Sequence, residues 1–485
     1  GVSTQTEDAF HQFGALCTLA LIVLEWLYVS VFYFAMHRRN FELEFIAFFL
    51  SGVGITVIGS IKPDDAFKQL LMLIAGVIGF IVLVFLMGDV DLCMRLRLPV
   101  AVAAILLLIV NIAIAKVTHG ARNWITIFGV TFQPSEFVKV AFIFVGAATL
   151  EKIQTSKNLY AFIAFSLVCV GALIVIKDFG TALIFFVTFL IIAFMNSGDI
   201  KTIFLALASA AMGGFIVIKY KSYVTARFSV YRHVWEHYND SGYQQTRVLV
   251  GLASGGLLGL GIGAGTTRGV WARTTDLIFG VICEEWGFLF GLLLVLSFVA
   301  IAVSALVNSI AARSTFYSIA AVAAAGLLLF QTALNIFGIT DVLPLTGVTL
   351  PFVSVGGSSM ISCWGLLAFL KAADTRPNAS FTLKLPKRIR GWIPPDADRM
   401  YDDRYNGWYD DYDEDAYEDY GYDDGYEDYD EYEDYDDYDQ FAEDWTQDRG
   451  GWEDLIDGPL WPEGEDPLAD PPPARGRSDE RRRRR

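Results

Sequence analysis

Cysteine and histidine are scarce in this 485-residue chain, which contains five of each. The cysteines stand alone in or beside apolar runs, and no Cys-x-x-Cys or Cys/His spacing is present. The sequence therefore does not support a structural zinc site or an extracellular disulfide framework. The histidines all lie outside the apolar runs, so no Ser/His/Asp arrangement is apparent, and Walker and zinc-protease motifs are missing as well.

Positive charge is also scarce where a nucleic-acid-binding protein would need it, because no basic patch exceeds Arg481–Arg485. Residues 396–485 hold 34 acidic and 10 basic side chains, whereas the rest of the chain holds 20 acidic and 27 basic ones. We therefore expect no nucleic-acid partner. Residues 396–485 are predicted to form a disordered, cytoplasmic Tyr/Asp/Glu-rich tail, and the basic residues 374–395 to lie on anionic lipid.

Long apolar runs are abundant, and eleven of them approach the roughly 20 residues that a membrane-spanning helix needs. Within a bilayer the backbone must bond to itself, which favours helices, and the alternation of a membrane barrel is absent. The sequence therefore predicts an all-α polytopic membrane protein. The predicted spans are 14–36, 43–61, 68–88, 97–115, 136–151, 159–177, 179–196, 202–219, 277–305, 316–338 and 350–371.

Lysine and arginine in the short loops predict the orientation. Those at Arg38, Arg95, Lys152 and Arg313, and those after the last span, fall on one side, which the positive-inside rule assigns to the cytoplasm. The N-terminus and the long connection 220–276 are then outside. That connection is itself rich in cations. Either loops of this length translocate regardless of charge, or the cations face an anionic substrate.

Polar residues collect at the predicted outer ends of the spans. Glu136 lies in the first turn of a helix that Pro134 begins, and Lys139, three residues on, is placed to pair with it. Residues 120–135 are expected to re-enter the membrane edge. Asp178 precedes a helix, so it is either a helix cap or a ligand for substrate or metal.

The long connection and the residues after it carry three further features. The glycines of residues 254–265 superficially match a dinucleotide fingerprint, but no strand precedes them, so close backbone approach or a broken helix is the better interpretation. Asp276 lies where the connection meets a long predicted helix, which suits a helix cap or a general base with a raised pKa. Glu285 would lie about 13 Å deeper in that helix. Residues 343–359 should break a helix near the outer surface.

Nine motifs in a fixed order resemble the SEDS family, which comprises the membrane proteins RodA, FtsW and SpoVE, over roughly residues 41–373. The chain departs from the family pattern at Trp271, Ala272 and Thr274. In chain order the motifs are Gly120-Ala-Arg-x-Trp124, Gln133-Pro-Ser-Glu-Phe-x-Lys139, Asp178-Phe-Gly-Thr-Ala182, Tyr243-Gln244, Ser254-Gly-Gly-x-x-Gly-x-Gly261, Thr275-Asp-x-Ile-Phe279, Glu284-Glu-x-Gly-Phe288, Leu343-Pro-x-Thr-Gly347 and Leu350-Pro-Phe-x-Ser-x-Gly-Gly-Ser-Ser359.

This resemblance implies a ten-helix bundle over residues 41–373, to which residues 1–40 add an extra transmembrane helix. It also implies a glycosyltransferase that polymerises peptidoglycan glycan strands from lipid II, with inversion, at the outer face of the bacterial cytoplasmic membrane. Asp276 is then the catalytic residue. The substrate-binding residues implied are Arg122, Glu136, Lys139, Asp178, Tyr243, Gln244 and Ser358.

The resemblance extends to cofactors and partners. The positive charge that the leaving diphosphate needs is expected from Arg122 and Lys139 or from a divalent cation, Mg²⁺ or Mn²⁺, held by carboxylates, and no organic cofactor is expected. The expected partners are lipid II, the undecaprenyl diphosphate product, a class B penicillin-binding protein and other divisome or elongasome proteins. Two alternatives remain open, a lipid II flippase and a scaffold that recruits a transpeptidase. The sequence does not separate an elongation, division or sporulation role.

Overall fold

A computed structural model describes residues 2–115, 122–127, 130–151, 156–198, 200–201, 204, 207–208 and 229–376, with side chains from Gln12 onward. Nearly all of the predicted span 202–219 lies outside the described residues. The predicted disordered tail 396–485 and most of the basic segment 374–395 also lie outside them. The chain separates into two compact units, residues 1–390 and 391–485, and every described residue belongs to the first unit.

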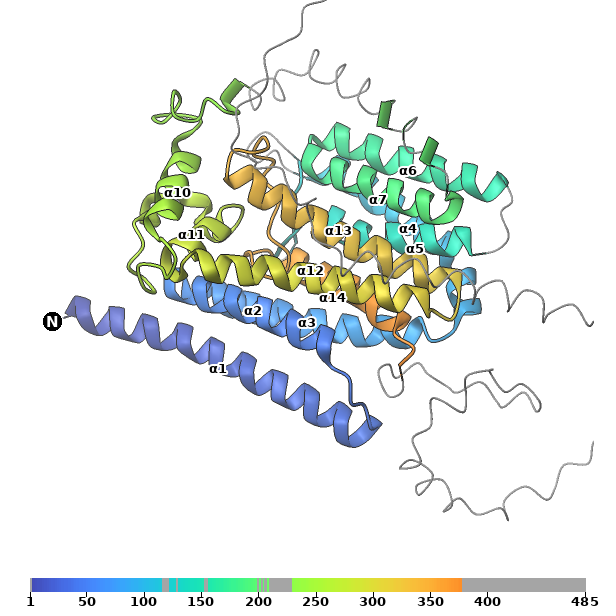
Figure 1. Cartoon of the computed structure of the whole chain (residues 1–485), viewed down its shortest axis with the longest axis horizontal. Coiled ribbons are helices and arrows are strands. Elements are labelled where there is room, and N and C mark those ends of the chain that lie inside the picture. Colours follow the sequence, from blue (N-terminus) through green and yellow to red (C-terminus); the bar gives the residue numbers. More distant parts are fainter. Residues whose placement is uncertain are drawn as a thin grey trace, which may run out of the picture. The chain divides into compact units, whose positions relative to one another are not determined.

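The described part of the chain is mostly helical (Figure 1). Two 3-10 helices, η1 (Thr267–Gly269) and η2 (Trp271–Thr274), and an antiparallel hairpin of β1 (Ile125–Ile127) and β2 (Val130–Phe132) complete it. The helices are α1 (Val2–Met36), α2 (Glu42–Ile61), α3 (Pro63–Leu86), α4 (Val90–Ile114), α5 (Pro134–Leu150), α6 (Ser156–Ile176), α7 (Phe179–Ser197), α10 (Tyr243–Ser254), α11 (Ile278–Trp286), α12 (Phe288–Ile310), α13 (Thr315–Ile339) and α14 (Gly357–Ala373).

Seven of the described helices are long and apolar enough to cross a bilayer, and α7 and α14 are shorter apolar helices. The predicted polytopic all-α membrane fold is confirmed. Its extra N-terminal helix is α1, whose residues 12–36 form one of the seven candidate spans. Helix α1 packs on α2 and α3 (Figure 1).

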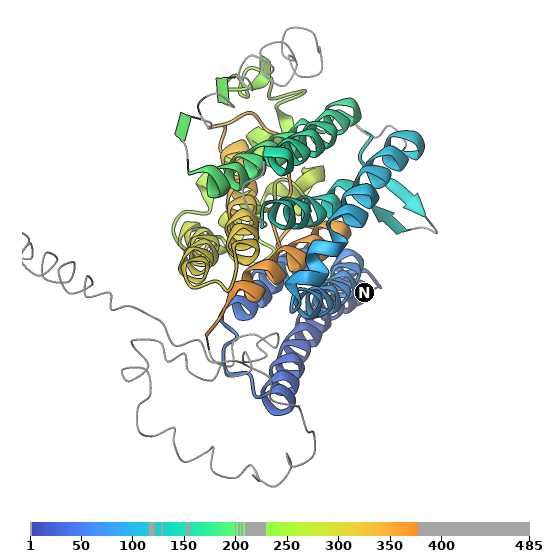
Figure 2. The ribbon, with the colours of Figure 1, turned by 90° about the vertical axis from the view of Figure 1, so that its right-hand side faces the viewer.

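Three predicted elements differ from the structure. The predicted helix 277–305 is two helices, because Gly287 takes a backbone conformation (φ 89°, ψ 166°) that ends α11 before α12 begins. The predicted helix 350–371 begins only at Gly357, because residues 343–356 are irregular. The stretch 120–135 contains the small hairpin, which lies at the periphery of the helices (Figure 2). Its depth in a membrane stays a prediction.

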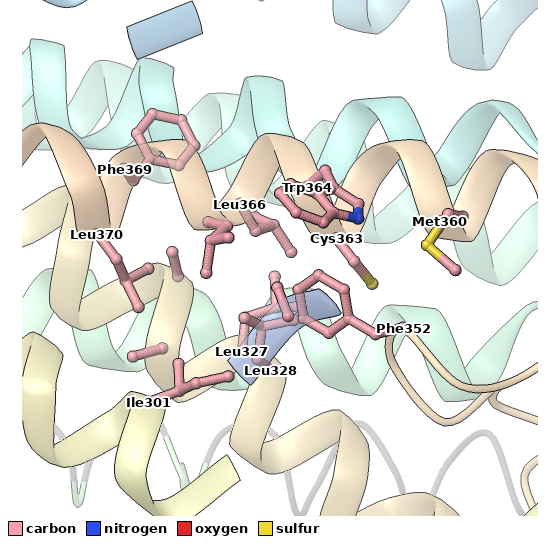
Figure 3. Packing of buried hydrophobic residues seen from close by; sticks show 14 of the residues in the cluster. Ile301, Leu327, Leu328, Phe352, Met360, Cys363, Trp364, Leu366, Phe369 and Leu370 are labelled. Carbon is pink, nitrogen blue, oxygen red and sulfur yellow. The ribbon is translucent and has the colours of Figure 1, made fainter. Parts of the chain in front are cut away.

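Helix α14 is the centre of the core, since nearly all its residues are buried against α3, α13 and α5. Trp364 is fully buried there, and the rings of Phe48, Phe80 and Phe352 meet it edge-on at centroid distances of 4.8, 5.7 and 6.3 Å. Phe352 comes from the irregular segment rather than from a helix (Figure 3). Packing on Trp364 therefore holds residues 343–356 against the helical core.

A buried charged cluster ties α1 to this core. The Glu44 carboxylate bonds Arg38 through one oxygen and lies 3.2 Å from Lys371 Nζ through the other, and all three side chains are almost fully buried. Lys371 also donates to the Asn40 carbonyl at 2.8 Å. Two cations thus share one carboxylate where α1 ends, α2 begins and α14 ends. This is the end of the bundle that the loop charges assign to the cytoplasm.

Candidate active site

Asp276 lies in the turn between η2 and α11, and α11 lies at the end of the bundle opposite the junction of α1 and α2, where that cluster sits (Figure 1). Its side chain is half-buried. Helix α11 begins at Ile278 with Leu277 at its N-cap position and no side-chain capping bond. The N-cap position of this helix is therefore taken by Leu277 and not by Asp276, and the catalytic role of Asp276 stays a prediction.

The backbone around Asp276 is held by the irregular segment 343–356 and by α13. Ser354 Oγ donates to the Thr275 carbonyl at 2.7 Å, and Val355 N donates to the Thr274 carbonyl at 2.8 Å. Asn335 of α13 donates to the Asp276 carbonyl at 2.8 Å. Three neighbouring carbonyls are thus fixed, which orients the Asp276 side chain from a rigid backbone.

Two amides one turn apart on α13 connect this segment to the rest of the bundle. Asn335 also donates to the Val348 carbonyl at 2.7 Å, and Gln331 donates to the Thr349 carbonyl at 2.9 Å. The Gln331 oxygen accepts from Lys139 Nζ at 2.8 Å. Gln331 was not predicted as a site residue. The available signal was its position in an apolar span, where an amide is costly unless it is hydrogen-bonded.

Glu136 and Lys139 form the predicted ion pair on α5, with 2.8 Å between Glu136 Oε1 and Lys139 Nζ. Their side chains are only 5% and 2% exposed, and Ser362 Oγ donates to the second Glu136 oxygen at 2.6 Å. Each charge thus has protein partners inside the bundle. Substrate binding by these two residues stays a prediction.

Asp178 caps α7, which confirms one of its two predicted roles. It accepts from Thr181 N at 3.1 Å, Asn123 Nδ2 at 3.0 Å and Gln133 Nε2 at 3.1 Å. Burial raises the pKa of this carboxyl, and the Thr181 N–H opposes that shift. The three donors draw β1, α5 and α7 together. A ligand role for Asp178 stays a prediction.

Arg122 and Ser358 lie in this same region. Ser358 Oγ, at the start of α14, accepts from Gln133 N at 3.1 Å. Arg122 donates its backbone N–H to the Ile176 carbonyl at 3.1 Å, and its side chain is exposed. The structure therefore gathers Arg122, Asp178 and Ser358 at the ends of α5, α6, α7 and α14. Substrate contact by any of them stays a prediction.

Tyr243 and Gln244 begin α10, and Gln244 contacts the segment that leads to Asp276. Gln244 Oε1 accepts from Ala272 N at 3.0 Å and so holds η2, which leads to Asp276. Tyr243 is partly exposed, with the Arg247 guanidinium 5.4 Å from its ring centre. Gln244 acts on the Asp276 segment directly, whereas substrate contacts of both residues stay predictions.

The glycine-rich residues 254–265 follow α10 and pack backbone against backbone on the break between α11 and α12. A Cβ on Gly255 would lie 2.2 Å from the Cys283 carbonyl oxygen, and one on Gly259 would lie 2.2 Å from that of Glu285. The predicted close backbone approach is confirmed. Glu284 and Glu285 precede the first residue of α12, so the predicted depth of Glu285 inside one long helix is wrong.

Two carboxylates of this region, Glu136 and Asp178, are already engaged by protein donors. Among the residues that the structure describes, no three His, Cys, Asp or Glu side chains gather as ligands. Asp178 has three donors, and Glu136 is bonded to Lys139 and Ser362. These donor sets do not fit a cation held by protein ligands alone.

Comparison with known proteins identifies the fold. Rod shape determining protein RodA of Thermus thermophilus has a TM-score of 0.52 at 24% identity, covering 68% of this chain and 95% of that one. A structure described as the structural coordination of polymerization and crosslinking by a peptidoglycan synthase complex has a TM-score of 0.59 at 24% identity, covering 68% and 96%. At these identities the likeness shows a shared fold.

Sequence relatives carry the comparison further. Peptidoglycan glycosyltransferase RodA of Mycobacterium leprae is 26% identical over 363 residues, 70% of this chain and 78% of that protein. Stage V sporulation protein E of Bacillus subtilis is 32% identical over 316 residues, 62% of this chain and 85% of that protein. Residues 62–378 match the model of the FtsW/RodA/SpoVE family, described as cell cycle proteins. The predicted family is confirmed: this chain belongs to the FtsW/RodA/SpoVE family.

Proposed function

We propose that this chain polymerises peptidoglycan glycan strands from lipid II at the outer face of the bacterial cytoplasmic membrane, with Asp276 as general base. The enzyme class is peptidoglycan glycosyltransferase, the name that RodA relatives carry and that FtsW relatives carry as probable. The proposal adds the lipid-linked substrate, the side of the membrane and the catalytic residue.

The position of Asp276 is the observation that carries this proposal. Its half-buried side chain projects from a backbone fixed by Ser354, Val355 and Asn335, at the end of the bundle opposite the buried Arg38–Glu44–Lys371 cluster. By the positive-inside rule, the end with cation-rich loops faces the cytoplasm, and Asp276 then faces outward. A carboxylate in such partly apolar surroundings suits proton abstraction.

The proposed step is an inverting displacement between two lipid-linked sugars. Asp276 takes the proton of the acceptor sugar's 4-hydroxyl as that oxygen attacks the donor's anomeric carbon from the face opposite the diphosphate. The new glycosidic C–O bond forms while the bond to the diphosphate breaks. Undecaprenyl diphosphate leaves with the electron pair, and the proton passes from Asp276 to water.

The leaving diphosphate requires positive charge near it. Arg122 is exposed at this end of the bundle and lies next to the capped end of α7, so we assign the contact to it. Lys139 is enclosed and bonded to Gln331, which in turn holds the Thr349 carbonyl. We therefore assign Glu136 and Lys139 to positioning of residues 343–356. Because the carboxylates present do not fit a resident cation, no step runs through one.

The same proposal covers the partners. A class B penicillin-binding protein would crosslink the strands that this chain makes, and the likeness to a peptidoglycan synthase complex supports such a partner. We place other divisome or elongasome proteins around the pair. The C-terminal residues 377–485 would then follow α14 on the cytoplasmic side, since α14 ends beside the charged cluster at Lys371.

The flippase alternative rests on charged groups at mid-depth in a long helix, such as Glu285. Because α11 ends at Trp286, Glu285 precedes the α12 span instead of lying inside it. Glu284, its neighbour, accepts hydrogen bonds from Thr266 and from Thr267 at 2.7 Å. No specific observation in the described residues therefore favours a transport pathway through this helix.

Polymerisation of purified lipid II in detergent tests the proposal, because a polymerase needs no second compartment whereas a flippase does. We expect glycan strands from the unmodified chain and none from Asp276→Asn. Asp240→Asn is the matched control, since Asp240 is an exposed carboxylate on the same connection. If Asp276→Asn made strands at the rate of the unmodified chain, the catalytic assignment would be refuted. If the unmodified chain were folded but made no strands, the proposed polymerase activity would be refuted.

A further inference from the structure

Residues 257–262, here called the apolar loop, expose large hydrophobic side chains outside any helix. Leu257 is 62% exposed, Leu258 82%, Leu260 44% and Ile262 61%. They belong to the connection that leads from α10 to Asp276. An exposed cluster of this kind on a loop marks a surface that something covers.

The backbone of the apolar loop is tied to the start of α12. Leu260 N donates to the Glu284 carbonyl at 2.9 Å and Gly261 N to the Glu285 carbonyl at 3.0 Å. In the other direction, Phe288 N donates to the Gly256 carbonyl at 2.9 Å and Leu289 N to the Leu257 carbonyl at 3.2 Å. These bonds hold the backbone of the apolar loop against the end of α11 and the start of α12, so its side chains are presented from a fixed position.

The exposed surface of the loop continues into the surface of a membrane span. Phe288 and Leu289, which bond the loop, are each 52% exposed, and Leu292 and Leu293 of the next turn are 42% and 46% exposed. Helix α12, which these residues begin, is one of the candidate membrane spans, so its exposed apolar face lies against lipid. The hydrogen bonds place the apolar loop beside the first residues of that face.

We propose that the apolar loop inserts its leucine and isoleucine side chains into the bilayer, in the leaflet next to the Asp276 end of the bundle. The occupant of this surface is lipid, because the surface is continuous with the lipid-facing side of α12. Trp271 is 66% exposed on the same connection, and tryptophan is typical of the membrane–water interface. The glycines at 259 and 261, with φ of 83° and 104°, give the loop the sharp turns that bring it back onto α12.

Insertion would hold the Asp276 segment at the membrane surface. Glu284 bonds Thr266 and Thr267 immediately after the loop, and Gln244 bonds Ala272 shortly before Asp276. The chain between loop and aspartate is therefore fixed to elements that the loop anchors. This consequence rests on the proposed function. Under that function, the Asp276 carboxylate must lie at the depth where the sugars of a lipid-linked substrate emerge from the bilayer.

Nitroxide labelling in lipid nanodiscs tests insertion without reference to activity. The full chain carries Leu258→Cys, and Ser241→Cys is the matched control because Ser241 is an exposed polar residue of the same connection. All five native cysteines are buried, so the unmodified chain reports the background. We expect the label at 258 to collide more with oxygen than with a nickel chelate, and the label at 241 to show the reverse.

Two results would overturn the proposal. Nickel accessibility at 258 equal to that at 241 would mean that the loop lies in water. Shielding of the 258 label from both reagents would mean that protein covers the loop, including a second copy of this chain. Leu260→Cys repeats the measurement if labelling at 258 disturbs folding, which a thermal unfolding midpoint reports.

Kinetics form a separate arm. We expect Leu258→Asp to raise the KM for lipid II several-fold in nanodiscs with little change in kcat, because a charge there opposes insertion and weakens substrate capture. A lowered kcat with unchanged KM would contradict the anchoring consequence. If the chain proves not to polymerise lipid II, the nitroxide depths still decide whether the loop inserts.

Discussion

Replacing Lys139 by Met should destabilise the protein strongly, although the two side chains are similar in length. Lys139 Nζ lies 2.8 Å from both Glu136 Oε1 and Gln331 Oε1. Methionine removes the charge and leaves the Glu136 carboxylate buried, with Ser362 Oγ as its remaining donor among the described residues. Most of the lost stability therefore comes from burying a charge without a partner, and less from losing the contact itself.

The size of the effect follows from this difference. Breaking a buried pair by removing one partner costs about 3–5 kcal/mol, whereas replacing both partners by neutral groups is often close to neutral. For a protein of this size the single variant should lower the midpoint of thermal unfolding by roughly 5–10 °C. In the double variant Glu136→Gln/Lys139→Met, the introduced amide oxygen still accepts from Ser362 and no buried charge remains, so most of that loss should be recovered.

The assay is thermal unfolding of the purified chain in one detergent, for the unmodified protein, both single variants and the double variant. The coupling energy of this cycle should be about 2–3 kcal/mol and favourable. Additive losses, with the double variant at the sum of the singles, would refute the reasoning. Polymerisation by the double variant adds a second readout, since a stable but inactive protein would support substrate contact by this pair.

Two further predictions concern the backbone around Asp276. Gly259→Ala should lower the midpoint of thermal unfolding more than Gly261→Ala. A Cβ on Gly259 would lie 2.2 Å from the Glu285 carbonyl oxygen, whereas nothing lies within 4 Å of a Cβ on Gly261. Equal shifts of the two midpoints would contradict the packing described. Asn335→Ala should cost about 1–3 kcal/mol for each of the two carbonyls that it leaves unbonded, that of Asp276 among them, and should lower kcat more than it raises KM. An unchanged kcat in steady-state polymerisation would show that Asp276 does not depend on this anchor.

Sequence patterns predicted most of the membrane helices because hydropathy over a window reports burial in lipid directly. The spans at α2 to α7 and at α13 appear within several residues of their expected ends, whereas α1 ends as expected at Met36 but begins twelve residues earlier, at Val2. The break at Gly287 was not predicted, because the residues on both sides are apolar and only the backbone conformation of one glycine separates α11 from α12. A window average does not register such a residue.

The candidate site was predictable in composition but not in its connections. The order of the motifs predicted Asp276 as the catalytic residue, which stays a prediction, and the spacing of Glu136 and Lys139 gave their pairing correctly. Gln331 and Asn335 of α13 bond the carbonyls of Thr349 and Val348, which lie well past the end of that helix in the sequence. No local sequence pattern encodes such contacts. The same holds for Gln69, which bonds both Ser354 and Gly356 across nearly 300 residues of sequence.

The location of the Asp276 side chain tests the central claim most directly. In cells expressing Asp276→Cys, a membrane-impermeant thiol reagent should label the protein from outside, because the native cysteines are buried and contribute little background. Arg313→Cys, in the exposed turn before α13 at the opposite end, should label only after the membrane is opened. Labelling of Asp276→Cys only after opening, or under neither condition, would contradict a carboxylate that meets lipid-linked sugars outside the cell.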